Sequence, residues 1–115
     1  MDKLAHYREV IEEALQRIVE LTESAHTKTP SLRDKAVLDR KVDSYLIVRE
    51  GWDGPHHVSR IVVNLEILND KIWIQEDWLE HGIAHLLEEA GVPKNEIVLG
   101  FQSPEIRSLT DYAAA

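Results

Sequence analysis

Apolar side chains in the first part of the chain recur with the period of an α-helix. They follow one another at spacings of three and four at Leu4, Tyr7, Ile11, Ala14, Ile18 and Leu21. Such spacing places them on one helix face, and the glutamates fall mainly outside it. The pattern predicts a long helix over residues 2–23 that lies across a sheet. The same spacing also fits a heptad repeat, so association as a homodimer stays open.

The middle of the chain changes to the period of β-strands. Residues 24–31 have turn composition and predict a loop. Strands are then expected at residues 35–39, 43–50, 57–68 and 72–75. The longest of them has Ile61, Val63, Leu65 and Ile67 on one side, with Arg60, Val62, Asn64 and Glu66 on the other. Asn69 and Asp70 predict a two-residue hairpin turn, since both residue types tolerate positive φ.

The last third of the chain mixes helical and strand signals. Asp77 is placed as the N-cap of a second helix, with Glu80 at the capping-box position and Gly91 at the end. A short strand follows at 97–99, and Ser103 with Pro104 predicts a short last helix. These elements predict one α+β domain over residues 1–115, with a long N-terminal helix and a second helix packed on an antiparallel-rich sheet of about five strands.

Charge changes the range of partners that the chain is expected to take. The formal net charge is −8, which disfavours direct nucleic-acid binding, because phosphate contacts need clustered Lys and Arg. Basic residues concentrate in the middle of the chain. If they share one face of the sheet, they leave a DNA-binding module as an alternative; they are Arg33, Lys35, Arg40, Lys41 and Arg60.

Composition also bears on location and covalent chemistry. The chain has no cysteine, which excludes disulfides and thiolate chemistry and fits a reducing compartment. We find no apolar run long enough to span a bilayer and no basic-then-apolar signal peptide. We therefore expect a cytoplasmic protein that does not associate with membranes.

Histidines supply the candidates for a metal site. His81, His85 and Glu88 follow one another at i, i+4 and i+7, and on a helix they would share one face and could bind Zn²⁺. This leaves a weak metal-dependent hydrolase as an alternative function. A loop is predicted at Gly51-Trp52-Asp53-Gly54-Pro55. His56 and His57 follow Trp52 in this connection, where we interpret them as surface residues. The sequence contains no nucleophile elbow or phosphate loop, so no cofactor and no catalytic residue is assigned.

The three tryptophans are the candidates for partner binding. Trp52 falls in a predicted loop, Trp73 on the outward phase of a strand, and Trp78 at the expected start of the second helix. Tryptophan is enriched at interface hot spots. Trp73 could instead be covered by the first helix, and both interpretations indicate a second sheet face that something covers.

Several blocks of the chain, taken together, are typical of a known family. They are Leu4-x-x-Tyr7, Gly51-Trp52, Lys71-Ile72-Trp73-Ile74-Gln75, Ala90-Gly91-Val92-Pro93-Lys94, and Glu96-Ile97-Val98-Leu99-Gly100-Phe101. In this register the chain resembles the XisI family, the excision controlling factors of cyanobacteria, over essentially its whole length.

The resemblance implies an accessory, non-enzymatic role in the programmed excision of a DNA element. It implies a separate recombinase and a companion protein, XisH, which looks nuclease-like. It supplies no catalytic residues. We therefore expect a regulatory protein that binds an XisH-like partner, to which an acidic surface would be complementary.

Overall fold

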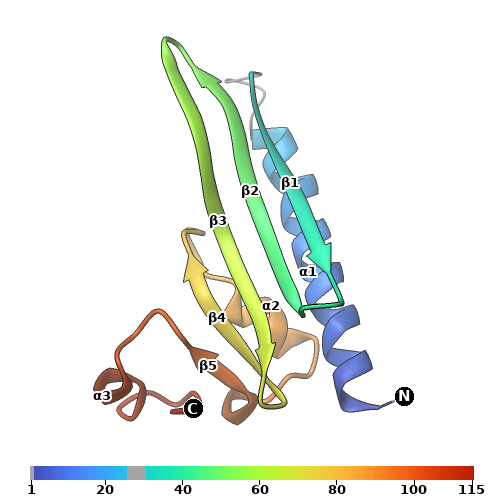
Figure 1. Ribbon diagram of the computed structural model, residues 1–115, viewed down its shortest axis with the longest axis vertical. Helices are drawn as coiled ribbons and strands as arrows, with labels where there is room; N and C mark the ends of the chain where they lie inside the picture. Colours follow the sequence, from blue (N-terminus) through green and yellow to red (C-terminus); the bar gives the residue numbers. More distant parts are fainter. Residues whose placement is uncertain (1, 26–30) are drawn as a thin grey trace.

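The computed structural model describes residues 2–25 and 31–115, so most of the predicted loop at 24–31 lies outside the described residues. Figure 1 shows the order of the elements along the chain. They are α1 (Lys3–Ala25), β1 (Leu32–Asp39), β2 (Ser44–Asp53), β3 (His56–Leu68), β4 (Lys71–Asp77), α2 (Ala84–Glu89), a 3₁₀ turn η2 (Lys94–Glu96), β5 (Ile97–Leu99) and α3 (Pro104–Arg107).

The five strands form one sheet in chain order, β1-β2-β3-β4-β5. The first three pairs are antiparallel, and β4 pairs with β5 in parallel. The parallel pair follows from the helix α2, which carries the chain back across the sheet between the two strands. The predicted α+β class, the strand number and the long first helix are confirmed.

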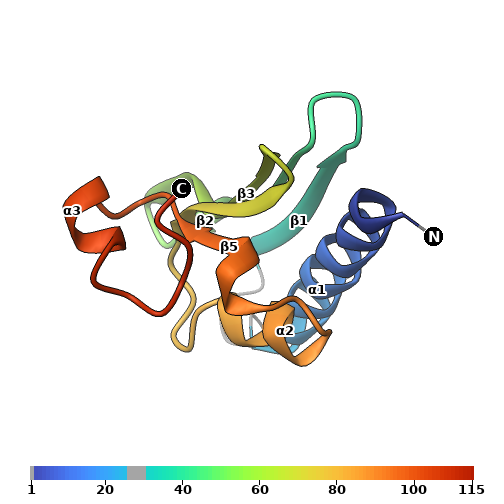
Figure 2. The same cartoon turned by 90° about the horizontal axis from the view of Figure 1, so that it is seen from below.

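The molecule has two layers. Both α1 and α2 lie on one side of the sheet, as the end-on view in Figure 2 shows. Between the layers is the core, to which the helix contributes Tyr7, Val10, Ile11, Ala14 and Leu15, and the strands contribute Tyr45, Ile47, Val62, Val63, Leu65, Ile72, Ile74 and Ile97. The long helix therefore covers only one face of the sheet.

An ionic contact fixes α1 against the turn between β1 and β2. Arg8 donates two hydrogen bonds to the carboxylate of Asp43, at 2.9 and 3.1 Å. The buried Tyr45 donates its hydroxyl hydrogen to the same carboxylate at 2.8 Å. Charge-assisted pairing of this kind orients the helix over the strands. The hydrogen bonds from Arg8 and Tyr45 hold the pKa of Asp43 below its usual value, although partial burial opposes them.

The β2–β3 hairpin is longer than the sequence predicted. The loop expected at 51–55 is too long, because β2 continues to Asp53 and β3 begins at His56, which leaves only the turn at Gly54-Pro55. Gly51 lets the strand continue beside Ser31. Its φ is +138°, and a Cβ there would collide with the carbonyl oxygen of Ser31. Gly51, which indicated a loop in the sequence, is therefore required by a close backbone approach within a strand.

A bulge in β3 changes which residues reach the core. Ile47 pairs with Val63 and Val48 pairs with Ile61, so Val62 is the extra residue. Val62 and Val63 are both buried, whereas Ile61 is only half-buried. The predicted alternation over 57–68 holds from Val63 onward. It is wrong for Ile61 and Val62, because the bulge shifts the phase of the pleat.

The predicted helix beginning at Asp77 is wrong, because α2 begins only at Ala84. The backbone N–H of Trp78 donates to the carbonyl of Val62 at 2.9 Å, which keeps the chain extended after β4. The carboxylate of Asp77 then accepts hydrogen bonds from the backbone of Leu79 and Ile83, at 3.1 and 2.8 Å. Asp77 therefore caps a loop rather than a helix.

The C-terminal segment follows the prediction. Ser103 accepts a hydrogen bond from the backbone of Ile106, and Pro104 is the first residue of α3. The chain then returns to the sheet, where Ala113 forms a parallel bridge with Val98. Val98 is fully buried beneath this segment.

We expect Asp43→Asn to lower the stability of the fold and to flatten its dependence on acid. Asparagine keeps the tolerance for the positive φ of 50° at this position but loses the charge. The pKa of Asp43 is lower in the folded chain than in the unfolded chain. Its contribution is therefore present above about pH 4 and is lost as the pH falls through the folded-state value. Urea unfolding at pH 7 should show a loss of about 1 kcal/mol.

The same unfolding series at about pH 3 gives the control for this prediction, because the difference between wild type and Asp43→Asn should shrink there. An equal difference at both pH values would contradict the role given to the Arg8–Asp43 pair.

Candidate protein-interaction surfaces

The sheet face that turns away from the helices carries an apolar stripe. Its members are the half-buried Leu46, Val48 and Ile61, together with Val37, which is 40% exposed. Val37 pairs with Leu46, and Val48 pairs with Ile61. Leu46 and Val48 are neighbours on one face of β2, so the stripe steps diagonally across three strands. No described helix covers this part of the sheet (Figure 2).

Two of the three tryptophans are exposed around this face. Trp52 is 52% exposed at the end of the long hairpin, where its ring lies 4.9 Å from that of its cross-strand partner His57. Trp78 is 67% exposed, and its indole N–H donates to the carboxylate of Glu76 at 2.7 Å. Exposed tryptophans beside an apolar stripe are typical of protein-binding surfaces.

The third tryptophan is already covered by the chain itself. Trp73 faces away from the core, as predicted, because its neighbours Ile72 and Ile74 are buried. It is covered by the C-terminal segment, not by α1, and the Arg107 guanidinium lies 5.2 Å from its ring. The approach of Gly100 is so close that a Cβ there would lie 3.1 Å from the Trp73 ring. Trp73 thus anchors the C-terminal segment to the sheet.

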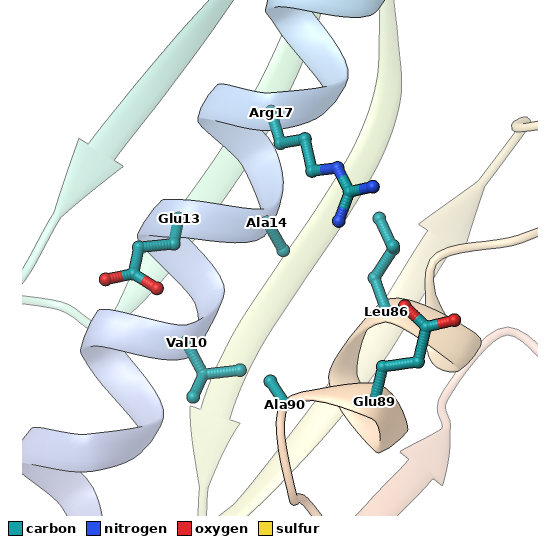
Figure 3. Close-up of a pocket in the computed structure, with 7 residues that line it drawn as sticks. All are labelled: Val10, Glu13, Ala14, Arg17, Leu86, Glu89 and Ala90. Carbon is teal, nitrogen blue, oxygen red and sulfur yellow. The ribbon is translucent and has the colours of Figure 1, made fainter.

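A second candidate surface is a groove between the two helices. Figure 3 shows Val10 and Ala14 of α1 opposite Leu86 and Ala90, with Arg17 reaching into the space between them. The hollow has a volume of about 320 Å³. Its floor is apolar and includes two alanines, so it can receive side chains from a partner.

The groove continues toward the end of α1. An adjoining hollow of about 390 Å³ shares Arg17 and Leu86 with the first and adds Ile18 and Leu21. Leu21 is 60% exposed there. The charged residues that line the two hollows are Glu13, Glu80 and Glu89, with Arg17 between them. We call this surface the acidic groove.

The histidines predicted as metal ligands line the second hollow but do not form the predicted arrangement. His85 lies in α2, whereas His81 lies before it, and Gly82 between them has a φ of +74°. Glu88 is engaged elsewhere, since it accepts a hydrogen bond from Tyr112 at 2.9 Å and pairs with Lys94. Within residues 2–25 and 31–115, no three His, Asp or Glu side chains gather as a metal site.

The basic residues proposed for DNA binding are divided between the two faces. Arg33 and Lys35 lie on the face of the stripe, in pairing register with Glu50 and Val48. Arg40 points to the helix layer, where it forms two hydrogen bonds with Glu12 at 2.8 and 2.6 Å. Arg60 pairs in register with Arg49, which binds the buried Asp34 under the helix layer. The single basic face that this hypothesis required is not formed.

Sequence reasoning missed the stripe and the acidic groove. A signal for the stripe was available, because the block Tyr45 to Val48 is apolar at every position. A strand with one wet face would alternate, so this block indicated that both faces are covered. The sequence signal for the groove was weaker. Leu21 belongs to the apolar face of α1 but lies outside the buried core.

Two solved structures resemble this chain along its whole length. One is the fdxN element excision controlling factor XisI from Anabaena variabilis, with 37% identity, a TM-score of 0.80, and coverage of 99% of this chain and 100% of that chain. The other is a XisI-like protein from the same organism, with 29% identity, a TM-score of 0.81, and coverage of 97% and 99%. No protein of curated function matches the chain in sequence.

The fold and its surfaces define an α+β domain with a sheet face that is bare over β1, β2 and β3, and with one acidic helical groove. The sequence pattern described as XisI protein matches residues 1–114, and the chain belongs to this family. Among the described helices, none combines the length and the apolar character needed to cross a bilayer.

We expect no stoichiometric zinc site at His81 and His85, because the turn at Gly82 takes His81 off the helix that carries His85. Protein incubated with zinc and dialysed should retain well under one equivalent, measured by atomic emission. The variant His85→Ala should retain the same amount. One equivalent held by the wild type and lost in His85→Ala would contradict this prediction.

Proposed function

We propose that this chain is an accessory protein in the control of DNA-element excision, and that it acts by binding an XisH-like protein rather than by catalysis. The acidic groove between α1 and α2 carries the proposal. The family and the relative named as an excision controlling factor support a regulatory role. The companion protein is the partner that the family resemblance implied.

The shape of the groove favours an amphipathic segment of the partner. Small residues, Ala14 and Ala90, let another chain approach closely, and Val10 and Leu86 offer apolar contacts. A helix or an extended segment with apolar residues on one side would fill this floor. Burial of such side chains would supply most of the affinity.

The charge of the groove selects for a basic partner. Glu13 and Glu89 line the first hollow, and Glu80 lines the second. Among the described residues that line either hollow, Arg17 is the one Lys or Arg. Residues 76–96 also carry most of the formal net charge of −8. A protein that handles DNA carries Lys and Arg to meet phosphates. Such a surface would be attracted to the groove, with faster association at low salt.

The test uses the chain with an XisH-like protein co-expressed from the same genetic locus. We expect a complex that copurifies at about 50 mM salt and weakens at about 500 mM, since screened charges contribute less. The double variant Glu13→Lys/Glu89→Lys should weaken binding about tenfold or more, which corresponds to about 1.4 kcal/mol. Isothermal titration calorimetry measures both effects.

Two further variants separate the groove from a general charge effect. Leu86→Asp should weaken binding without changing the circular dichroism of the chain, because Leu86 is only partly buried. Glu20→Lys makes the same charge change as one groove variant at an exposed position of α1 outside the groove lining, and it should bind like the wild type. Equal binding by all variants would refute the groove as the docking site. Separate elution of the two wild-type proteins would refute the partner.

A further inference from the structure

The apolar stripe on the open sheet face separates two groups of opposite charge. On the side toward the hairpin tip are Arg33 and Lys35, both exposed on β1. On the other side, Glu66 of β3 and Glu76 of β4 lie on the same face, in register with Ser44 and Asn64. The charged residues are close to the stripe in the strand register. Lys35 pairs with Val48 of the stripe, and Asn64, which pairs with Leu46, is two residues from Glu66.

Among residues 2–25 and 31–115, the basic group is only partly neutralised, and no ion pair involves Glu66 or Glu76. Glu50 lies 3.5 Å from Arg33 and 3.7 Å from Lys35, so one carboxylate serves two cations. Glu76 accepts the indole N–H of Trp78, which carries no charge. The open face therefore has an apolar stripe in the middle, a basic flank on one side of it and an acidic flank on the other.

A surface with this symmetry is complementary to itself. Rotation of a second copy by 180° about an axis that runs along the stripe places stripe on stripe. The same rotation brings the basic flank of each copy over the acidic flank of the other. Arg33 of one copy then falls near Glu66 and Glu76 of its mate, and the reverse contact forms by symmetry.

We propose that this chain forms a two-fold homodimer through the open sheet face, with the stripe of Val37, Leu46, Val48 and Ile61 at the centre of the interface. The strands of the two sheets would cross nearly at right angles, one of the two usual ways in which sheets pack face to face. Trp78 would lie at the rim of the apolar contact. The arrangement converts a two-layer molecule into four layers with a second dry core.

The charge pattern favours a second copy over other occupants. A partner that is basic throughout would be repelled by Arg33 and Lys35. DNA would be repelled by Glu66 and Glu76. The proposal does not depend on the XisH-like partner, because the acidic groove lies on the opposite side of the sheet and stays free in the dimer.

The first test measures the mass of the purified chain by sedimentation velocity over a range of concentrations. We expect a dimer that dissociates on dilution. Val48→Asp, which puts an uncompensated charge at the centre of the stripe, should be monomeric at a concentration where the wild type is dimeric. Circular dichroism and thermal unfolding establish that this variant is folded.

A charge-exchange experiment tests the two-fold arrangement itself. Arg33→Glu and Glu66→Lys should each weaken the dimer about tenfold or more, because each places like charges opposite each other at two symmetric contacts. A one-to-one mixture of these two variants should restore the dimer, since each mixed pair again has opposite charges at both contacts. Recovery shows that these two flanks meet across the interface, and a mass that stops at two copies shows that the contact is isologous, because a head-to-tail contact would continue to larger assemblies.

The controls carry the same charge changes away from the face. Arg60→Glu, on the helix side of β3, and Glu20→Lys, on α1, should dimerise like the wild type. A wild type that is monomeric up to about 1 mM would overturn the proposal. So would a dimer that is unaffected by Val48→Asp and by both charge variants, because the two copies would then meet elsewhere. Binding of the XisH-like protein by the groove is scored separately and can fail or succeed independently.

Discussion

The sheet is apolar on both faces, but the long helix α1 can cover only one of them. The core places Ile11 and Leu15 of α1 against one face of the strands, and both are fully buried. On the other face, Leu46 and Val48 have no helix above them within the described residues. Burial of this apolar core decides which face is covered, and the ion pair between Arg8 and Asp43 ties the helix to the β1–β2 turn on that side. The bare face, the exposed tryptophans and the groove beside α2 all follow from that choice.

Much of the fold could be predicted from the sequence, because its elements are dictated by local patterns. The period of α1, the turn at Asn69-Asp70 and the cap at Ser103 depend on residues close together in the chain. The second helix could not be predicted from its capping signal. Its expected cap, Asp77, is drawn into a loop by the hydrogen bond from Trp78 to Val62, a contact between strands that no local pattern contains. The bulge at Val62 was hidden for the same reason, since it depends on how two strands pair.

The sequence indicated that the chain has a contact surface, but it did not indicate where on the fold that surface lies. Tryptophans indicated a contact surface, and the structure places Trp52 and Trp78 around the bare face. Trp73, for which cover by a partner and cover by the first helix were both open, is instead covered by the chain's own C-terminal segment beneath Arg107. The acidic groove could not be inferred, because it needs α1 and α2 to lie side by side. The acidic groove is lined by Glu13, Glu80 and Glu89 with Arg17. The bare face carries both signs, with Arg33 and Lys35 on one flank and Glu66 and Glu76 on the other.

The position of Asp34 has a consequence for how the molecule behaves at high concentration. β1 is the outer strand on one side of the sheet, and outer strands are templates for the growth of fibrils. The Asp34 side chain points inward from this strand and has no exposed surface, with Arg49 bound to it at 2.8 Å. An inward-pointing charge on an outer strand disfavours pairing with a strand of another molecule, because the added strand would have to lie beside a charged pair instead of an apolar layer. The sheet therefore resists lengthening at its margin, and crowding of many copies is not expected to seed amyloid there.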